Sequence, residues 1–401
     1  MLYMGQNIIA VVDCDSFFVS CEQNECPELW GQAVCVLGNN DGCVVARSKE
    51  AKKIGVRMGM PYFMAKKEFP DVIYLSGNMD LYIRKSNEIM AALRTMFAEV
   101  EQYSIDEAFV NMNGLQKFYN MDCPQIAAFV RAKIKEDIGI PVSIGVSTSK
   151  TLAKLASIRA KKSREGVYVI SRMCQKELKM TQIDDVWGLG RKLVPKLNKY
   201  DVKTAFDYVS LSDEFIIQLL GKKGYELKQE LLGNSMYPVN MKVALPKSIQ
   251  KTSSFPKCTS DKAYIKNALH YHIHTACKKL RKTEIENISL KCFGIGLYLK
   301  TKNFQIIYDK IELKTPTNWE LDIISEIDKL FEKNYNSDII YRSSGVILFN
   351  LVSDYQSQCS LFDDTERIVK SQKLGACIDN NEAKFGRNII KTGFFKNIKD
   401  I

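Results

Sequence analysis

The sequence predicts an α+β protein built from several domains. The chain has 401 residues, too long for one ordinary hydrophobic core, and about two to four domains are expected at this length. Strand and helix patterns are mixed as far as about residue 170, and a helical pattern follows to residue 237. A compact β-α-β-β-α-β order comes after that stretch. These changes of pattern mark the candidate domain boundaries.

The first region begins with an apolar strand over residues 7–13 that ends in an acid. Residues 33–37 and 42–46 are short strands on either side of a polar Gly-Asn-Asn-Asp turn, which is typical of a hairpin. The other predicted elements are helices over 48–54, 80–97 and 124–137, a strand, turn and strand over 100–112, a strand over 142–146, and a helix that Thr148 or Ser149 caps and that ends near residue 161.

The later part of the chain changes character twice. Residues 171–237 have a helical pattern, and the Pro- and Lys-containing stretch 238–253 is predicted to be a linker. The predicted elements beyond it include strands over 288–302, 304–314 and 344–352 and a helix over 320–334. The tail from Asp354 is polar and poorly patterned.

Composition narrows the class of protein. Hydrophobic residues make up 46% of the chain and charged residues 26%, as in a soluble globular protein. The formal net charge of +11 suits a polyanionic partner, and nucleic acid is the commonest one. The longest apolar run near the start, residues 8–12, is too short for a signal peptide or a membrane span. We therefore expect a cytoplasmic protein with no membrane partner.

Cysteine and histidine spacing gives little support to a zinc site or a disulfide framework. The 12 cysteines include no Cys-x-x-Cys pair, so reduced, buried thiols are the preferred interpretation. His270, His272 and His274 would share one face of a strand, as metal ligands do. Their apolar neighbours follow helical spacing instead, and on a helix only His270 and His274 share a face. We favour the helix over the metal site.

Three acids are the candidate catalytic residues. Asp13 ends a buried strand, and Asp106 and Glu107 lie between apolar strand residues, where two adjacent acids are costly unless a cation neutralises them. Hard oxygen ligands of this kind suit Mg²⁺. Taken singly, each motif also fits an ordinary strand end or an exposed hairpin tip. One acid on the first strand and a pair on a later hairpin together are typical of a polymerase-type palm, where two Mg²⁺ ions serve nucleotidyl transfer.

Several motifs in this order resemble the Y-family DNA polymerases. The segment from Val12 to Phe18 is similar to their first motif, that from Ser104 to Phe109 to their second, and that from Gly145 to Lys161 to their third. The segment from Asn39 to Arg47 is closer still to the UmuC/ImpB-type branch, the polymerase V catalytic-subunit type. The resemblance runs from about residue 8 to residue 352.

The resemblance implies a right-hand polymerase. Its parts would be a palm (1–30 and 79–170), small fingers (31–78), a helical thumb with a helix-hairpin-helix (171–240), a β-α-β-β-α-β little finger (241–353) and a C-terminal tail (354–401). The implied function is error-prone translesion DNA synthesis on primer–template DNA with dNTPs, in damage tolerance and SOS mutagenesis. Asp13 and Asp106 would bridge both Mg²⁺ ions, Glu107 would complete the catalytic-metal site, and the Cys14 carbonyl would be a further ligand.

Nucleotide contacts also follow from the resemblance. Phe18 corresponds to the steric gate that excludes a ribose 2′-hydroxyl, and Phe17 accompanies it, with core packing as the alternative for Phe17. Lys52 and Lys161 match basic contacts to the triphosphate, and a solvated helix face is the alternative for each. Lys49 stands where many members of the family have Tyr, so a point charge would replace one phosphate hydrogen bond.

Two further segments suggest macromolecular partners. The segment from Val186 to Lys192 resembles a helix-hairpin-helix, with Gly188, Gly190, Arg191 and Lys192 as contacts to the DNA backbone and an ordinary helix turn as the alternative. Gln358, Leu361 and Phe362 fit a peptide that binds the bacterial sliding clamp. A UmuD′-like dimer and a recombinase filament are further partners suggested by this branch.

Two other functions fit parts of the same sequence. A different palm-type nucleotidyl transferase, such as a nucleotidyl cyclase, would use similar metals but needs no helix-hairpin-helix or clamp peptide. A non-catalytic DNA-binding damage-response protein on the same scaffold would not need the three acids, all of which are present in this sequence.

Overall fold

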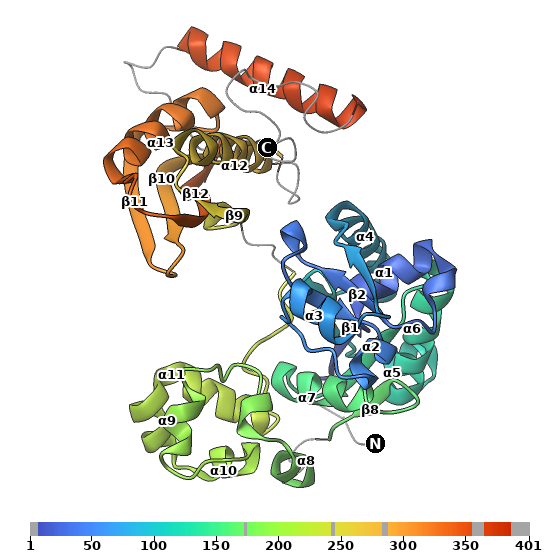
Figure 1. Cartoon of the computed structure of the whole chain (residues 1–401). Coiled ribbons are helices and arrows are strands. Elements are labelled where there is room, and N and C mark those ends of the chain that lie inside the picture. The colour runs from blue at the N-terminus through green and yellow to red at the C-terminus, as the bar shows by residue number, and fades with distance from the viewer. Residues whose placement is uncertain (1–6, 172–174, 242–244, 283–287, 355–364, 386–401) are drawn as a thin grey trace. The chain divides into compact units, whose positions relative to one another are not determined.

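The computed structural model of the protein describes residues 7–171, 175–241, 245–282, 288–354 and 365–385 (Figure 1). The chain divides into two compact units, Met1–Lys242 and Val243–Ile401. The first unit contains the mixed and helical regions that the sequence predicts, and the second contains the β-α-β-β-α-β region.

A five-stranded sheet forms the centre of the first unit, in the order β5-β6-β1-β7-β8. Its central strand β1 pairs antiparallel with β6 on one side and β7 on the other. The strands are β1 (Ile9–Cys14), β5 (Val100–Gln102), β6 (Glu107–Asn111), β7 (Val142–Ser147) and β8 (Val167–Val169). The predicted first strand and the predicted strand–turn–strand are both confirmed.

Helices cover both faces of this sheet, and β1 is therefore buried at every position. Val12 faces the core shared with α4 and α6, whereas Val11 faces α7. Side chains alternate along a strand, so Asp13 emerges on the α7 face. The helices of this layer are α1 (Phe17–Glu25), α4 (Met79–Met96), α5 (Leu115–Tyr119), α6 (Cys123–Ile138) and α7 (Lys150–Ala160).

Strand β7 and helix α7 pack with almost no space between their backbones. A Cβ atom added at Gly145 of β7 would lie 2.1 Å from the Ser157 nitrogen and 2.4 Å from the Ala153 carbonyl oxygen. Ser149, rather than Thr148, caps α7 by accepting the Leu152 N–H. The missing side chain at position 145 therefore sets how closely α7 approaches the sheet.

The buried carboxylate of Glu230 joins the N-terminus of α7 to the end of the helical region. One oxygen accepts the Thr151 N–H at 2.9 Å, and the other accepts the N–H groups of Met236 and Tyr237 at 2.6 and 3.0 Å. Three backbone donors and the positive end of a helix stabilise this anion out of water.

Two smaller parts complete the first unit. The predicted hairpin is confirmed as β2 and β3, and β2 also pairs in parallel with β4. Its elements are η1 (Pro27–Leu29), β2 (Val34–Leu37), η2 (Asn39–Asp41), β3 (Val44–Arg47), α2 (Lys49–Lys53), α3 (Tyr62–Glu68) and β4 (Ile73–Ser76). The helical part consists of α8 (Gln175–Met180), η3 (Ile183–Asp185), α9 (Val194–Asn198), α10 (Ala205–Ser210) and α11 (Asp213–Leu231).

The second unit has the predicted β-α-β-β-α-β order around an antiparallel sheet, β11-β10-β12-β9. Its elements are β9 (Ser248–Thr259), α12 (Lys262–Arg281), β10 (Leu290–Thr301), β11 (Ile306–Thr317), α13 (Glu320–Asn334) and β12 (Tyr341–Ser353). The predicted linker over 238–253 is wrong in its second half, because β9 begins at Ser248. Polar residues fill most of this edge strand, and only Ile249 and Phe255 are buried apolar positions on it.

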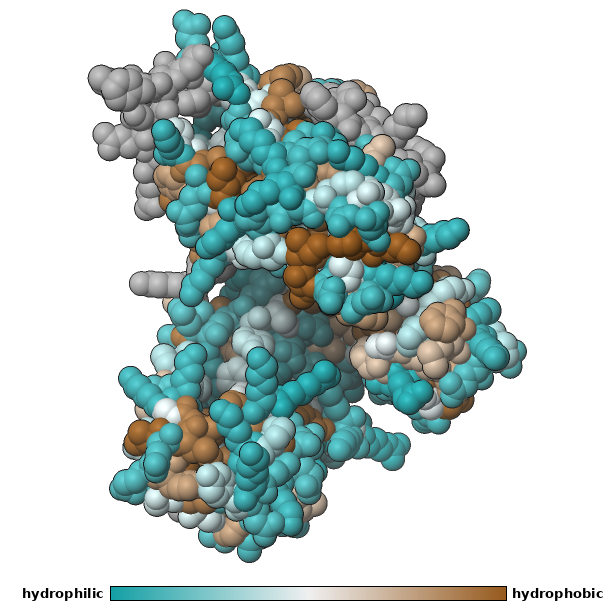
Figure 2. All heavy atoms as spheres, turned by 60° about the vertical axis from the view of Figure 1, so that its left-hand side comes forward, coloured by the Kyte–Doolittle hydropathy of each residue, from teal (hydrophilic) through white to brown (hydrophobic). Residues whose placement is uncertain are grey.

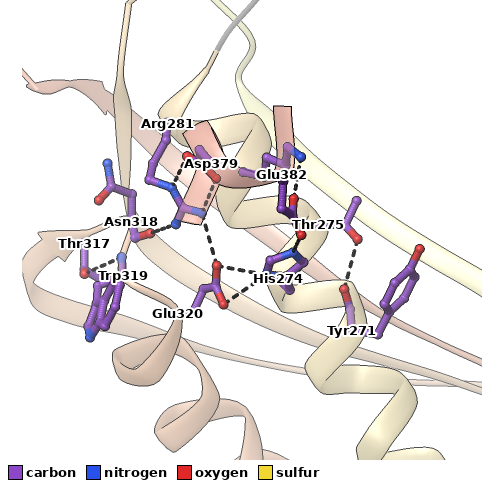
Figure 3. Close-up of polar contacts among 11 residues, drawn as sticks. Tyr271, His274, Thr275, Arg281, Thr317, Asn318, Trp319, Glu320, Asp379 and Glu382 are labelled. Atoms are coloured by element: carbon purple, nitrogen blue, oxygen red, sulfur yellow. Dashed lines mark hydrogen bonds and ion pairs between the residues drawn. The ribbon is translucent and has the colours of Figure 1, made fainter. Parts of the chain in front are cut away.

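The tail that the sequence shows as poorly patterned contains a helix, α14 (Thr365–Phe385). Charged side chains attach it to α12, as Figure 3 shows: Arg281 donates to both oxygens of Asp379 at 2.7 and 3.0 Å. Lys278 donates to Glu382 at 2.5 Å. The buried side chains of α14 include Glu382 as well as Ile378, so the apolar stripe by which the sequence would reveal a helix is interrupted.

The three histidines lie on α12, as predicted, and all are buried. His270 contacts Asp328 at 2.9 Å, and His272 contacts Ser253 at 3.2 Å. His274 lies between two carboxylates, with Nδ1 3.1 Å from Glu320 and Nε2 3.2 Å from Glu382. Each imidazole is thus engaged by a side chain of the protein, which supports the packing interpretation.

The face in Figure 2 is largely hydrophilic, and apolar side chains form separate patches on it. None of the helices in the described ranges is long and apolar enough to cross a membrane.

Replacing Gly145 with alanine should destabilise the first unit by about 3 kcal/mol or more, because the added methyl group meets backbone atoms that cannot move aside. Urea unfolding of the purified protein measures this change. Gly42→Ala is the control, since a Cβ at Gly42 meets nothing within 4 Å. Equal stability of the two variants would contradict the close contact.

His274 should make the stability of the second unit depend on pH. Burial alone lowers the pKa of His274, but Glu320 and Glu382 more than offset this and raise it. A raised folded pKa gives stability that is present below the ordinary value of about 6.5 and lost as pH rises through the folded value. The stability advantage of the wild type over His274→Gln should therefore shrink as pH rises above about 6.5 in thermal unfolding.

His272→Gln is the matched control on the same helix. Burial lowers the pKa of His272 to about 3, so this residue is neutral in the folded protein. Its effect on stability should change only below about pH 6.5, where the unfolded chain takes up a proton. A His274→Gln variant with the same pH profile as His272→Gln would refute the assignment.

Candidate active site

The three predicted acids lie at one end of strands β1 and β6. Asp13 is directly opposite Glu107 in the β1–β6 ladder, and its side chain is 5% exposed. Asp106 precedes β6, and its carbonyl oxygen accepts the Cys14 N–H at 2.9 Å. The Asp106 carboxylate accepts the Ser104 hydroxyl at 2.6 Å. We call Asp13, Asp106 and Glu107 the acid cluster.

Two lysines of the α7 segment contact the acid cluster from the same face. Lys161 Nζ, just after the helix, lies 2.6 Å from Asp13 Oδ1, and Lys154 Nζ contacts Glu107 Oε1. Burial raises the pKa of Asp13, Lys161 lowers it and the neighbouring Glu107 raises it, so that it ends well above its ordinary value. Burial alone would also raise the pKa of Glu107, but hydrogen bonds with Asp13 and Lys154 lower it. The two carboxyl groups therefore favour opposite protonation states.

The donors at the acid cluster fit a hard divalent cation. The pKa of Asp13 stays above its ordinary value despite the lysine partner. A further positive charge would stabilise the ionised form of this buried carboxyl group. Among the described residues, no three His, Cys, Asp or Glu side chains lie close enough together to hold a metal ion in this arrangement. Lysines contact two of the acids instead. Burial raises the pKa of the Cys14 thiol and keeps it protonated, which leaves the predicted backbone carbonyl as the oxygen donor of that residue.

A second cluster of cations lies beside the N-terminus of α1. Ser16 adopts a left-handed conformation with φ of 48° at the N-cap of α1, and its hydroxyl accepts a hydrogen bond from Lys52 Nζ at 2.8 Å. Burial lowers the pKa of Lys52, and the nearby cations Arg47 and Lys161 lower it further. Lys49 also adds to this effect. The predicted Lys49, Lys52 and Lys161 thus share one electropositive neighbourhood, suited to a phosphate group.

The two aromatic residues after Ser16 have different environments. Phe17 is buried in the core, as its alternative interpretation states. Phe18 is partly exposed and stacks on Tyr82, with ring centroids 4.4 Å apart and planes at 16°. The Tyr82 hydroxyl donates to Glu22 at 2.6 Å, which fixes the stacked ring. The sequence analysis missed Tyr82, whose only signal is its place on the apolar face of a helix.

The predicted helix-hairpin-helix has a short form. A 3₁₀ helix, η3, precedes the turn, and the five-residue helix α9 follows it. Gly188 has φ of 102°, a conformation that favours glycine. Gly188, Gly190, Arg191 and Lys192 are all exposed. Their contact with DNA stays a prediction. The predicted clamp-binding residues Gln358, Leu361 and Phe362 lie outside the described residues.

The fold and the acid cluster define a polymerase palm of the Y-family type. A Y-family DNA polymerase chimera of Dbh and Dpo4 superimposes with a TM-score of 0.71 and 25% sequence identity, covering 86% of this chain and 99% of the other. The insertion ternary complex of Dbh DNA polymerase gives a TM-score of 0.57 over the same shares, also at 25% identity.

Sequence comparison identifies the branch. The model of the impB/mucB/samB family matches residues 12–158, and that of its C-terminal domain matches residues 246–361. Protein UmuC of Salmonella typhimurium is 33% identical, over 96% of this chain and 92% of that protein. DNA polymerase IV of Treponema denticola is 29% identical, over 95% and 94%. The chain belongs to the impB/mucB/samB family, the UmuC-type branch of the Y-family DNA polymerases, which are translesion enzymes of SOS mutagenesis.

Proposed function

We propose that this chain adds deoxynucleotides to a primer 3′-hydroxyl on damaged template DNA, with the acid cluster as its catalytic centre. The observation that carries the proposal is the pairing of Asp13 with Glu107 across two buried strands, with Asp106 beside them. Ionising all three acids in this largely buried place requires positive charge beyond that of Lys154 and Lys161, and Mg²⁺ would supply it. The palm would comprise residues 1–30 and 79–170, and the fingers residues 31–78.

The acid cluster and the Cys14 carbonyl would hold two Mg²⁺ ions. When bound, these ions lower the pKa of the primer hydroxyl and neutralise charge on the pyrophosphate that leaves. Asp13 and Asp106 would serve both ions and Glu107 the catalytic one. The protein's own contribution is to fix these oxygens on adjacent rigid strands before substrate arrives.

The cation cluster at α1 would bind the triphosphate. Lys52, Lys161 and Lys49 supply positive charge, and the first backbone N–H groups of α1 offer donors to phosphate oxygens. Phe18 would lie beneath the sugar, held flat by its stack on Tyr82. A ring in that position leaves no room for a 2′-hydroxyl, which would select deoxynucleotides.

The remaining contacts would grip the duplex without reading its sequence. Gly188, Gly190, Arg191 and Lys192 would meet one strand of the backbone in the thumb, residues 171–240. The little finger, residues 241–353, presents exposed Lys302, Lys310 and Lys314. Lys291, on strand β10 of the same domain, is instead buried and pairs with Asp354 at 2.7 Å. Gln358, Leu361 and Phe362, in the tail over 354–401, would bind the sliding clamp, and a UmuD′-like dimer and a recombinase filament would be accessory partners.

Asp106→Ala should reduce primer extension by at least about a thousandfold, because it removes an essential group of the catalytic centre. DNA affinity, measured by fluorescence anisotropy, should stay nearly unchanged, since the proposed DNA contacts lie elsewhere. Asp137→Ala, on the surface of α6, is the control for loss of an acid. Normal primer extension by Asp106→Ala would refute the assignment of the catalytic centre. Formation of cyclic nucleotides by the wild-type protein, without primer extension, would favour the cyclase.

Phe18→Ala should raise ribonucleotide incorporation relative to deoxynucleotide incorporation by at least about tenfold in kcat/KM, because space opens beneath the sugar. Single-nucleotide extension with matched dNTP and rNTP pairs measures the ratio. Phe63→Ala, an exposed aromatic residue of the fingers, is the control. An unchanged ratio in Phe18→Ala would assign sugar selection to another residue.

A further inference from the structure

Lys154 contacts the acid cluster but has no part in the proposed nucleotide contacts. Its ammonium group contacts Glu107 Oε1, and the two side chains are only 14% and 19% exposed. The same ammonium lies 5.8 Å from the centroid of the Tyr103 ring. The pair is thus largely shielded from water, where a charge–charge contact is stronger than at the surface.

Helix α7 fixes Lys154 in this place. The helix is capped by Ser149 and lies against the backbone of β7 at Gly145, so its position on the sheet is set. One turn earlier, Lys150 pairs with Glu101 at 2.5 Å, on the same β5–β6 hairpin. The two pairs have the same chemistry and the same supporting elements. They differ in that Glu107 belongs to the acid cluster and Glu101 does not.

A carboxylate oxygen in contact with an ammonium group is a poorer ligand for a divalent cation. The cation must either displace the lysine or sit beside a like charge in a partly buried place, and both cost free energy. The same contact fixes the rotamer of Glu107, which favours reaction once the cation is present. Lys154 therefore has opposite effects on metal binding and on orientation of the ligand.

We propose that Lys154 is a positioning residue that holds Glu107 in place and suppresses divalent-cation binding until substrates bring their own negative charge to the site. This inference rests on the proposed function of the acid cluster. DNA and a nucleoside triphosphate add the anions that offset the lysine, so the site fills with metal mainly when both are bound. The Lys154–Glu107 pair thus links metal loading to substrate loading.

The test is a titration of the full chain with Mn²⁺ in the absence of DNA and nucleotide. Electron paramagnetic resonance measures the concentration of the free ion. Lys154→Met should bind Mn²⁺ about tenfold more tightly than the wild type, because a neighbouring positive charge is removed. Lys150→Met, the matched control, should change the affinity by less than about twofold. Lys154→Arg keeps the charge and should bind as weakly as the wild type.

Kinetics give a second readout. Lys154→Met should lower kcat for primer extension at saturating metal, since Glu107 is less well oriented, and should require less metal for half-maximal rate. A merely structural role would leave that metal requirement unchanged. Unchanged or weaker Mn²⁺ binding by folded Lys154→Met would overturn the inference. If that variant does not fold, Lys154→Gln carries the same expectation and the same refutation.

The failure of this inference can be told from failure of the proposed function. Asp106→Asn, introduced into Lys154→Met, should abolish the tightened Mn²⁺ binding if the acid cluster holds the ion. Tight binding that survives Asp106→Asn would place the ion elsewhere and refute both proposals. Wild-type binding that depends on Asp106 but not on Lys154 would leave the proposed function standing and refute the inference alone.

Discussion

The packing of α7 against β7 at Gly145 is the contact on which the rest of the first unit depends. It sets the distance between the helix and the sheet, and three contacts depend on that distance. The N-terminus of α7 meets the buried carboxylate of Glu230, its middle presents Lys154 to Glu107, and the turn after it brings Lys161 to Asp13. One short helix thus connects the helical region, the β5–β6 hairpin and the central strand.

This arrangement gives two members of the acid cluster cationic partners from within the protein. Buried acids repel one another, and a sheet edge carrying them would not be stable unless cations were close. The protein supplies lysines from the α7 segment, and the ammonium of Lys154 also lies 5.8 Å from the centroid of the Tyr103 ring. Asp13 and Glu107 are held in register on two adjacent strands, which is the preorganisation that the proposed phosphoryl transfer requires.

Local patterns in the sequence were enough to predict the parts of the site that lie on single strands or turns. Asp13, Asp106 and Glu107 stand out because acids are rare beside apolar strand residues. Tyr82 and the Lys154–Glu107 pair were not predicted, since they depend on which helix face meets which strand. Helix α14 was missed for another reason: Asp379 and Glu382 contact its partner α12, so acids interrupt the apolar pattern although Ile378 is buried.

Helix α14 extends the second unit beyond its sheet. Strand β12 ends at Ser353 and α14 begins at Thr365, and ion pairs attach α14 to α12 of the same unit. Both the last strand of the sheet and the helix beyond it are therefore anchored within the second unit. A truncation before Thr365 would remove these carboxylate partners of Lys278 and Arg281 on α12.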